Sequence, residues 1–320
     1  MTHPTDRAIH RVAACMSALA ALLCLCTDAT AQDLSDIPGA FVDVGIGTRE
    51  MGMGGASVAS SKGPTAVFWN PARLAAPETR DGLALTHGDV MGLVPYSAAA
   101  GVKRVGTDWA FAAGMLYSGD DALSEMTVIL SAATSLQDPA WLAEAPMLVG
   151  LSARLRRASF GGDGGESSGV TGDALGAALD AGVVCPISEG ARLAVTGRDI
   201  VGVLHWDSSA SGTYEEGVPP GLTFGIAVDV GEHGIIEADL DKALSLDGRD
   251  LLVLGAEADI FHVATVRVGY RRALQPHELE EFSLGGGVSV SAACAELDVD
   301  VAYLFARLDD TLRLSVGFRF

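Results

Sequence analysis

The sequence lacks an apolar run long enough to cross a membrane as a helix. Its longest such run covers residues 12–26, which is 15 residues, whereas a spanning helix needs about 20. The mean hydropathy of the chain is nevertheless positive, so apolar residues are dispersed and not collected in one block. A membrane β-barrel has this distribution, because its lipid-facing side chains occupy every second position of each strand.

Basic residues are also scarce. The chain has 21 Lys and Arg against 41 Asp and Glu, a formal net charge of −20. Nucleic-acid binding depends on Lys and Arg contacts to phosphates, and no basic patch with interleaved aromatic residues is found. We therefore expect no nucleic-acid partner.

The N-terminal segment has the pattern of a secretory signal peptide. A basic region, an apolar region and a small-residue cleavage site follow one another: Arg7, His10 and Arg11, then residues 12–26, then Ala29-Thr30-Ala31. We predict that residues 1–31 are removed and that Gln32 begins the mature chain. A short core helix is one alternative. A lipoprotein anchor is the other, and it is disfavoured because Leu23 and Leu25 precede the cysteines where a small residue is needed.

Only two of the five cysteines, Cys185 and Cys294, remain in the mature chain. They have no Cys-x-x-Cys spacing, so neither a metal site nor a redox motif is indicated. They form either one disulfide or two small buried apolar side chains, and the second interpretation is favoured.

From about residue 82 onward, apolar and polar residues alternate. In the last segment one face carries Leu312, Leu314, Val316, Phe318 and Phe320. The opposite face carries Thr311, Arg313, Ser315, Gly317 and Arg319. Successive side chains of a strand point to opposite faces, so this strand has one apolar face. Bacterial outer-membrane barrels typically end this way, and the resemblance implies that Phe318 and Phe320 form a signal for the outer-membrane assembly machinery.

Fourteen segments read as strands: 82–88, 95–104, 107–118, 124–134, 146–158, 172–186, 190–203, 221–231, 233–243, 249–261, 262–273, 279–291, 293–306 and 309–320. A soluble sandwich also alternates, but its strands have about 5–6 residues. These segments commonly have 9 to 12 residues, near the ~9–11 that cross a bilayer. Aromatic residues near segment ends fit an interfacial girdle: Trp109, Tyr117, Trp206, Tyr270, Tyr303, Phe318 and Phe320. We predict an all-β fold, a transmembrane antiparallel β-barrel of about 14 strands over residues 81–320.

The polar faces of these strands are expected to line a charged lumen. They carry Arg154, Arg156, Asp180, Glu237, Asp239, Asp241, Glu257, Asp259, Arg267, Arg271, Glu296, Asp298 and Asp300. Such charges usually satisfy one another and water. The pairs Asp239/Asp241 and Asp298/Asp300 have the chemistry for a divalent cation, but nothing fixes a ligand shell, so no metal site is predicted.

No catalytic constellation is found. The histidines of the mature chain are His87, His205, His233, His262 and His277, and none lies in a Ser/His/Asp or metal-ligand pattern. We expect no enzyme and no cofactor, although outer-membrane esterases exist as a class.

A glycine-rich segment precedes the barrel. It contains Gly45-x-Gly47, the run 51–56 (Met-Gly-Met-Gly-Gly-Ala) and the motif 69–72 (Trp-Asn-Pro-Ala). A nucleotide-binding loop is excluded, because Glu50 stands where the third glycine is needed and no βαβ unit follows.

This segment resembles the start of the PorV/PorQ family, within the FadL-like outer-membrane barrels. The resemblance implies that residues 32–80 form a hatch that plugs a fourteen-stranded barrel. Its motif residues here are Gly45, Gly47, Met51, Gly52, Gly54, Gly55, Trp69, Asn70, Pro71 and Ala72. The alternative is that residues 70–72 form only a turn into the first strand, since Asn and Pro favour turns.

Two functions follow from this resemblance. The first is an accessory of protein secretion of the type IX kind, whose partner is secreted protein cargo. The alternative is FadL-like transport of small hydrophobic compounds, such as long-chain fatty acids, across the outer membrane. Either function places the mature chain in the outer membrane, in contact with its lipid.

Overall fold

A computed structural model describes residues 45–90, 94–120, 122–136, 146–161, 169–244, 250–261, 263–274, 279–292, 295–306 and 310–320. The predicted signal peptide, residues 32–44 of the predicted hatch, and Cys294 lie outside these ranges. Among the residues in these ranges, no helix is both long and apolar enough to span a membrane.

In the described residues, short helices come first and strands follow. The helical elements are α2 (Thr48–Gly52), η1 (Gly63–Thr65), α3 (Ala66–Trp69) and η2 (Pro71–Ala75). The strands are β1 (Gly82–Val90), β2 (Val94–Val105), β3 (Trp109–Gly119), β4 (Leu123–Leu136), β5 (Met147–Phe160), β6 (Gly172–Ser188), β7 (Ala191–Ser208), β8 (Gly212–Gly217), β9 (Gly221–Val230), β10 (Gly234–Ala243), β11 (Leu251–Ile260), β12 (Ala264–Ala273), β13 (Glu280–Ala292), β14 (Ala295–Ala306) and β15 (Thr311–Arg319).

The strands close into an antiparallel barrel. Consecutive strands pair with one another, except that β9 pairs with β7 and not with β8. The pairing of β1 with β15 completes the ring. Of the fifteen strands, β8 pairs only with β7, so fourteen strands make up the ring. The fourteen predicted segments all correspond to ring strands, and the predicted fold class is confirmed.

The outward faces are apolar, as the alternation predicts. In β15, Leu312 and Leu314 are half exposed, whereas Thr311 and Arg313 are buried. Closure leaves no free sheet edge in the ring, so every ring strand hydrogen-bonds to two neighbours. An apolar exterior around such a ring requires a lipid environment.

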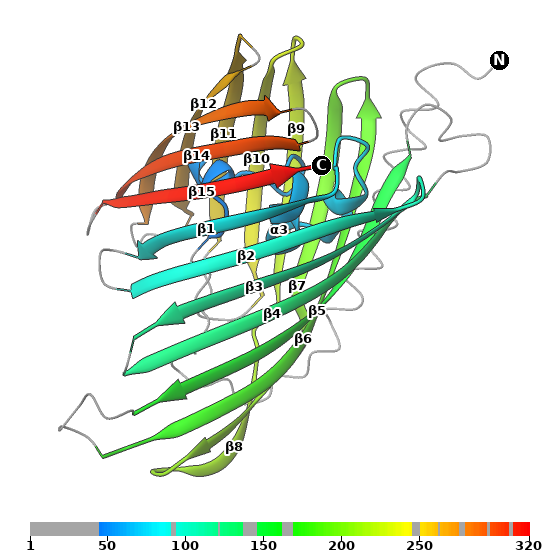
Figure 1. Ribbon diagram of the computed structural model, residues 1–320. Helices are drawn as coiled ribbons and strands as arrows, with labels where there is room; N and C mark the ends of the chain where they lie inside the picture. Colours follow the sequence, from blue (N-terminus) through cyan, green and yellow to red (C-terminus); the bar gives the residue numbers. More distant parts are fainter. Residues whose placement is uncertain are drawn as a thin grey trace.

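The barrel has two unlike ends (Figure 1). We call the end where β1 begins and β15 ends the terminal end, and the opposite one the far end. Strands β5 to β8 extend beyond the other strands at the far end (Figure 1). On this extension the outward side chains become polar, with Asp173, His205 and Glu215 exposed.

Strand β8 was not predicted, because its sequence Gly-Thr-Tyr-Glu-Glu-Gly contains no apolar alternation. Strand β7 continues to Ser208, beyond the predicted end at residue 203.

The predicted girdle is partly confirmed. Exposed or half-exposed aromatic side chains gather at both ends of the outward faces: Trp109, Phe111, Phe318 and Phe320 at the terminal end, and Tyr117, Tyr270, Tyr303 and Phe305 at the far end. Trp206 was placed wrongly, because it is buried on the inward face against Phe160 and Tyr214. The bulge in β7 described below precedes Trp206 and shifts which residues face inward.

Cys185 also differs from the favoured expectation. It is buried in β6 and disulfide-bonded. Disulfide formation depends on spatial proximity of two Cα atoms, which spacing along the chain does not reveal.

Candidate functional site

Residues 45–80, which we call the hatch, lie inside the barrel (Figure 1). Met51, Met53 and Leu74 are fully buried there. The chain turns sharply at Gly45, Gly47, Gly54 and Gly55, which have φ angles of 61°, 92°, 73° and 94°. These angles strain residues with a Cβ, which accounts for the glycines. The Trp69 indole N–H donates to the Ile46 carbonyl at 2.6 Å and ties α3 to the start of the hatch.

The glycine run of the hatch contacts glycines of the barrel wall. A Cβ built on Gly269 would lie 2.0 Å from the Gly54 nitrogen, and one on Gly255 would lie 2.6 Å from the Met53 oxygen. Gly255 and Gly269 are register partners on β11 and β12. The hatch backbone therefore rests directly on the wall, because the wall has no side chain at these two positions.

The Asn70-Pro71-Ala72 motif makes a second contact of this kind. Asn70 donates to the Val58 carbonyl at 2.8 Å and accepts from the Ala72 amide at 3.0 Å. A Cβ on Gly182 would lie 1.9 Å from Asn70 Oδ1, and one on Gly150 would lie 2.4 Å from the Pro71 carbonyl carbon. Gly150 and Gly182 are register partners on β5 and β6. The motif is both a turn and a fitted contact with the wall.

Two buried carboxylates of β10 hold the turn that follows the glycine run. Asp239 Oδ2 accepts from the Ser57 and Val58 amides at 2.8 and 3.2 Å, and Glu237 Oε1 accepts from the Ala59 amide at 2.6 Å. Both carboxylates were predicted to face the lumen. Sequence reasoning missed their hatch contact, because the partners are about 180 residues away.

A third carboxylate, Glu257 of β11, forms ion pairs with three basic side chains. Its oxygens lie 2.8 Å from Arg49 Nε, 3.0 Å from Lys62 Nζ and 2.7 Å from Arg267 Nε. Arg49 and Lys62 come from the hatch and Arg267 from the wall. Arg267 also binds Asp300 at 2.6 Å. The lumenal charges thus satisfy one another, as the sequence suggested.

Ionisation of the hatch groups is shifted by their surroundings. Burial raises the pKa of the Glu50 carboxyl, against the opposing effect of the Arg49 charge. The charge of Arg49 and burial together lower the pKa of Lys62. Burial alone would raise the pKa of Glu78. The Arg73 guanidinium and hydrogen bonds outweigh burial, so the pKa of Glu78 is lowered.

The carboxylates considered for a cation are occupied by protein donors. Asp241 accepts from Thr223, Asp298 binds Arg319 at 2.6 Å, and Asp300 binds Arg267. In the described part of the chain, no group of three or more His, Cys, Asp or Glu residues is arranged to hold a metal ion.

The hatch separates two cavities. One, of about 210 Å³, lies on its far-end side; we call it the far cavity. The other, of about 530 Å³, lies on its terminal-end side and is lined mostly by polar and charged side chains, among them Arg49, Lys62, Glu257 and Arg319.

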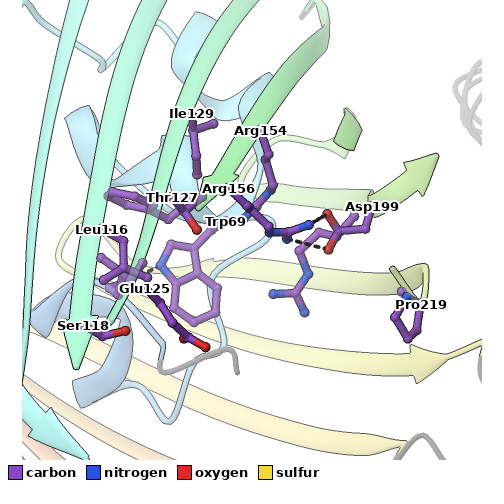
Figure 2. A pocket seen from close by; sticks show the side chains of 14 residues that line it. Trp69, Leu116, Ser118, Glu125, Thr127, Ile129, Arg154, Arg156, Asp199 and Pro219 are labelled. Atoms are coloured by element: carbon purple, nitrogen blue, oxygen red, sulfur yellow. Dashed lines mark hydrogen bonds and ion pairs between the residues drawn. The ribbon is translucent and has the colours of Figure 1, made fainter. Parts of the chain in front are cut away.

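The far cavity has an apolar part and a charged part. The apolar part consists of Ile46, Phe68, Trp69, Leu116 and Ile129, and the charged part includes Arg154, Arg156, Arg198, Asp199 and Glu125. Figure 2 shows Leu116 and Thr127 on one side of the Trp69 indole and the paired Arg156 and Asp199 on the other. Arg154 pairs with the buried Asp180.

Beside the far cavity, the hydrogen-bonded pairing of β7 with its neighbours on one side is interrupted; we call this place the wall interruption. Strand β7 pairs with β9 up to Arg198 and with β8 from Val203 onward. Between them, Asp199 has a φ of 50°, which is strained for a residue with a Cβ. On the other side, Pro219 and Pro220 have no amide to donate. The Asp199 amide donates instead to Asp180 Oδ1 at 2.9 Å, which stabilises the bulge.

Comparisons with known proteins identify the fold. No family model matches the sequence, and no curated protein does. The solved structure of the CymD monoaromatic hydrocarbon channel is similar, with 17% identity, 87% of this chain and 97% of that chain covered, and a TM-score of 0.60.

Two further solved structures are similar. The Ralstonia pickettii toluene transporter TbuX has 17% identity, with 86% and 98% of the chains covered and a TM-score of 0.57. A Pseudomonas aeruginosa FadL homologue has 12% identity, with 85% and 97% covered and a TM-score of 0.57. The chain therefore has the fold of a FadL-like, fourteen-stranded outer-membrane β-barrel. The names of the first two describe a monoaromatic hydrocarbon channel and a toluene transporter.

Proposed function

We propose that the protein is an outer-membrane channel for small hydrophobic compounds. The observation that carries this proposal is the far cavity, whose lining joins an apolar part to residues of an interruption in the barrel wall. Asp199 and Pro219 belong to both the cavity lining and the interruption. The hatch closes the direct path along the barrel axis. An apolar compound can bind in the far cavity, on the far-end side of the hatch. The names of the similar structures, a monoaromatic hydrocarbon channel and a toluene transporter, support the same substrate class.

The test is uptake of labelled toluene by cells that express the full chain. We expect faster uptake than in cells with an empty vector. Ser118 is buried and lines the far cavity, so Ser118→Trp fills the cavity and should return uptake to the vector level. The control is Thr213→Trp on the exposed far-end extension, which should leave uptake unchanged. Equal uptake with and without the protein, at matched amounts of folded barrel, contradicts the proposal.

Protein secretion is the other function that the sequence suggested. It rests on the resemblance of the glycine run and residues 69–72 to the PorV/PorQ family. In the structure these residues are largely buried against the barrel wall, so their role in packing is sufficient to account for them. We therefore prefer the channel. Co-purification of the intact barrel with a secreted protein would favour secretion instead.

We also propose that the mature chain begins after Ala31. Mass spectrometry of the protein recovered from outer membranes tests this cleavage.

A further inference from the structure

The far cavity is unusual in its charge. Its lining contains three guanidinium groups, of Arg154, Arg156 and Arg198, and two carboxylates, of Glu125 and Asp199, which gives 3 − 2 = +1. The whole chain has a net charge of −20. Two carboxylates outside the lining are near its guanidinium groups: Asp180 pairs with Arg154, and Asp241 lies 3.9 Å from Arg198. In a strongly acidic protein, the lining itself nevertheless carries one more cationic than anionic group, beside an apolar surface.

A bare hydrocarbon does not match both parts of such a cavity. It would pack well on Trp69 and Leu116, but it would press apolar surface against the guanidinium groups. Covering a charged group without supplying a hydrogen-bond partner is unfavourable. A ligand with one anionic group and one apolar ring satisfies both parts.

We propose that the ligand of the far cavity is a small aromatic or alicyclic carboxylate. Its ring lies against Trp69 and Leu116, and its carboxylate binds Arg156 in place of Asp199. This inference rests on the proposed channel function and specifies its substrate class.

The Arg156–Asp199 pair supports this geometry. Arg156 Nη1 and Nη2 lie 2.8 and 2.9 Å from the two Asp199 oxygens, the two-point arrangement that Arg makes with any carboxylate. A ligand carboxylate of the same shape can replace Asp199 without moving the guanidinium. Asp199 is on the strained bulge of β7, so this exchange also frees a side chain at the wall interruption.

The test compares three ligands of similar size on the full mature barrel in detergent: benzoate, toluene and benzylamine. Binding is measured by isothermal titration calorimetry at low and high salt. We expect benzoate to bind most tightly and to weaken as salt increases. Toluene binding as tightly as benzoate would overturn the inference, and so would preferential binding of benzylamine.

A variant pair locates the site. The double change Arg156→Gln with Asp199→Asn removes both members of the ion pair together, so neither is left charged without the other. It should weaken benzoate binding by about tenfold or more, the typical effect of losing a hydrogen bond to a charged group, and leave toluene binding almost unchanged. The control is Arg157→Gln, the next residue, whose exposed side chain lies 3.9 Å from Asp173. Unchanged benzoate binding in the double variant, with normal heat-modifiable migration, would overturn the inference.

Failure of this inference is distinguishable from failure of the proposed function. If toluene enters cells through the protein and benzoate neither binds nor enters, the channel stands and the carboxylate assignment is wrong. If benzoate binds at Arg156 but neither compound enters, the assigned ligand chemistry holds and the transport function is wrong.

Discussion

At the scale of single residues, glycine decides how the hatch fits the barrel. Gly150 and Gly182 receive the Asn70-Pro71-Ala72 motif, and Gly255 and Gly269 receive the glycine run. The sequence pointed to the hatch glycines through a family resemblance. It did not point to the wall glycines, because a glycine within a strand has many causes. Only the fold shows that these positions face the hatch.

Gly182→Ala tests this fit. The added Cβ would lie 1.9 Å from Asn70 Oδ1, so the hatch must shift or lose its hydrogen bonds. Overpacking of this kind typically costs about 1–3 kcal/mol. Urea unfolding followed by gel mobility should show the loss. The matched control is Gly286→Ala in β13, where the nearest atom is at an ordinary 3.8 Å; equal stability of the two variants would contradict the fitted contact.

Glu50 gives a pH prediction. Its pKa is raised from the ordinary 4.5 by burial, so its ionised form is less favourable in the folded protein than in the unfolded chain. The stability of the native protein should therefore fall, relative to Glu50→Gln, as pH rises above about 4.5. Urea midpoints measured from pH 4 to pH 8 check this.

Glu78→Gln is the control with the opposite sign. The pKa of Glu78 is lowered, so the native carboxylate contributes stability above its ordinary pKa that disappears as pH falls. A parallel response of the two variants would refute these assignments.

At the scale of elements, the alternation of each strand determines its lipid-facing side. Leu83 and Leu85 of β1 point outward, and Ala84 and Thr86 are buried. This was predictable, because the period of two places one whole set of side chains on one face. The bulge at Asp199 and strand β8 were not predictable. The bulge depends on the hydrogen bond from the Asp199 amide to the distant Asp180, which alternation does not encode. Strand β8 pairs with β7, but its own sequence has no apolar alternation.

Leu85→Arg tests the lipid-facing side. Leu85 lies in the middle of β1 with an exposed side chain. An arginine at the bilayer midplane of a barrel costs about 2–4 kcal/mol, so stability in lipid vesicles should fall by this amount. Thr213→Arg, on the far-end extension, should cost little. If Leu85→Arg is equally harmless in vesicles, the outward face of β1 does not contact lipid.

At the scale of the whole molecule, the hatch and barrel are one unit closed at β1 and β15. The Phe320 amide donates to the Asp81 carbonyl at 2.9 Å beside this closure, and the Phe320 side chain is exposed. Its side chain therefore contributes little to the finished fold and remains accessible during assembly.

Phe320→Ala separates assembly from stability. If Phe320 is part of an assembly signal, as the resemblance implies, we expect less folded barrel in the outer membrane of cells. The same variant refolded in detergent should have nearly the stability of the native protein. Comparing the gel migration of unheated and heated samples measures the folded fraction, both in outer membranes and after refolding in detergent. Normal amounts in the outer membrane would show that Phe320 is not part of an assembly signal, and Phe318→Ala tests the other member in the same way.

The sequence by itself determined the fold class, the ring of fourteen strands and their outward faces, because the alternation of side chains is a local property of each strand. It also identified the inward-facing charges. The tertiary structure alone decided what those charges do. Glu237 and Asp239 accept hydrogen bonds from the hatch backbone, and Glu257 forms ion pairs with three basic side chains. Arg156 faces Trp69 across a cavity. These contacts form because ring closure and the path of the hatch bring together residues that are far apart in the chain.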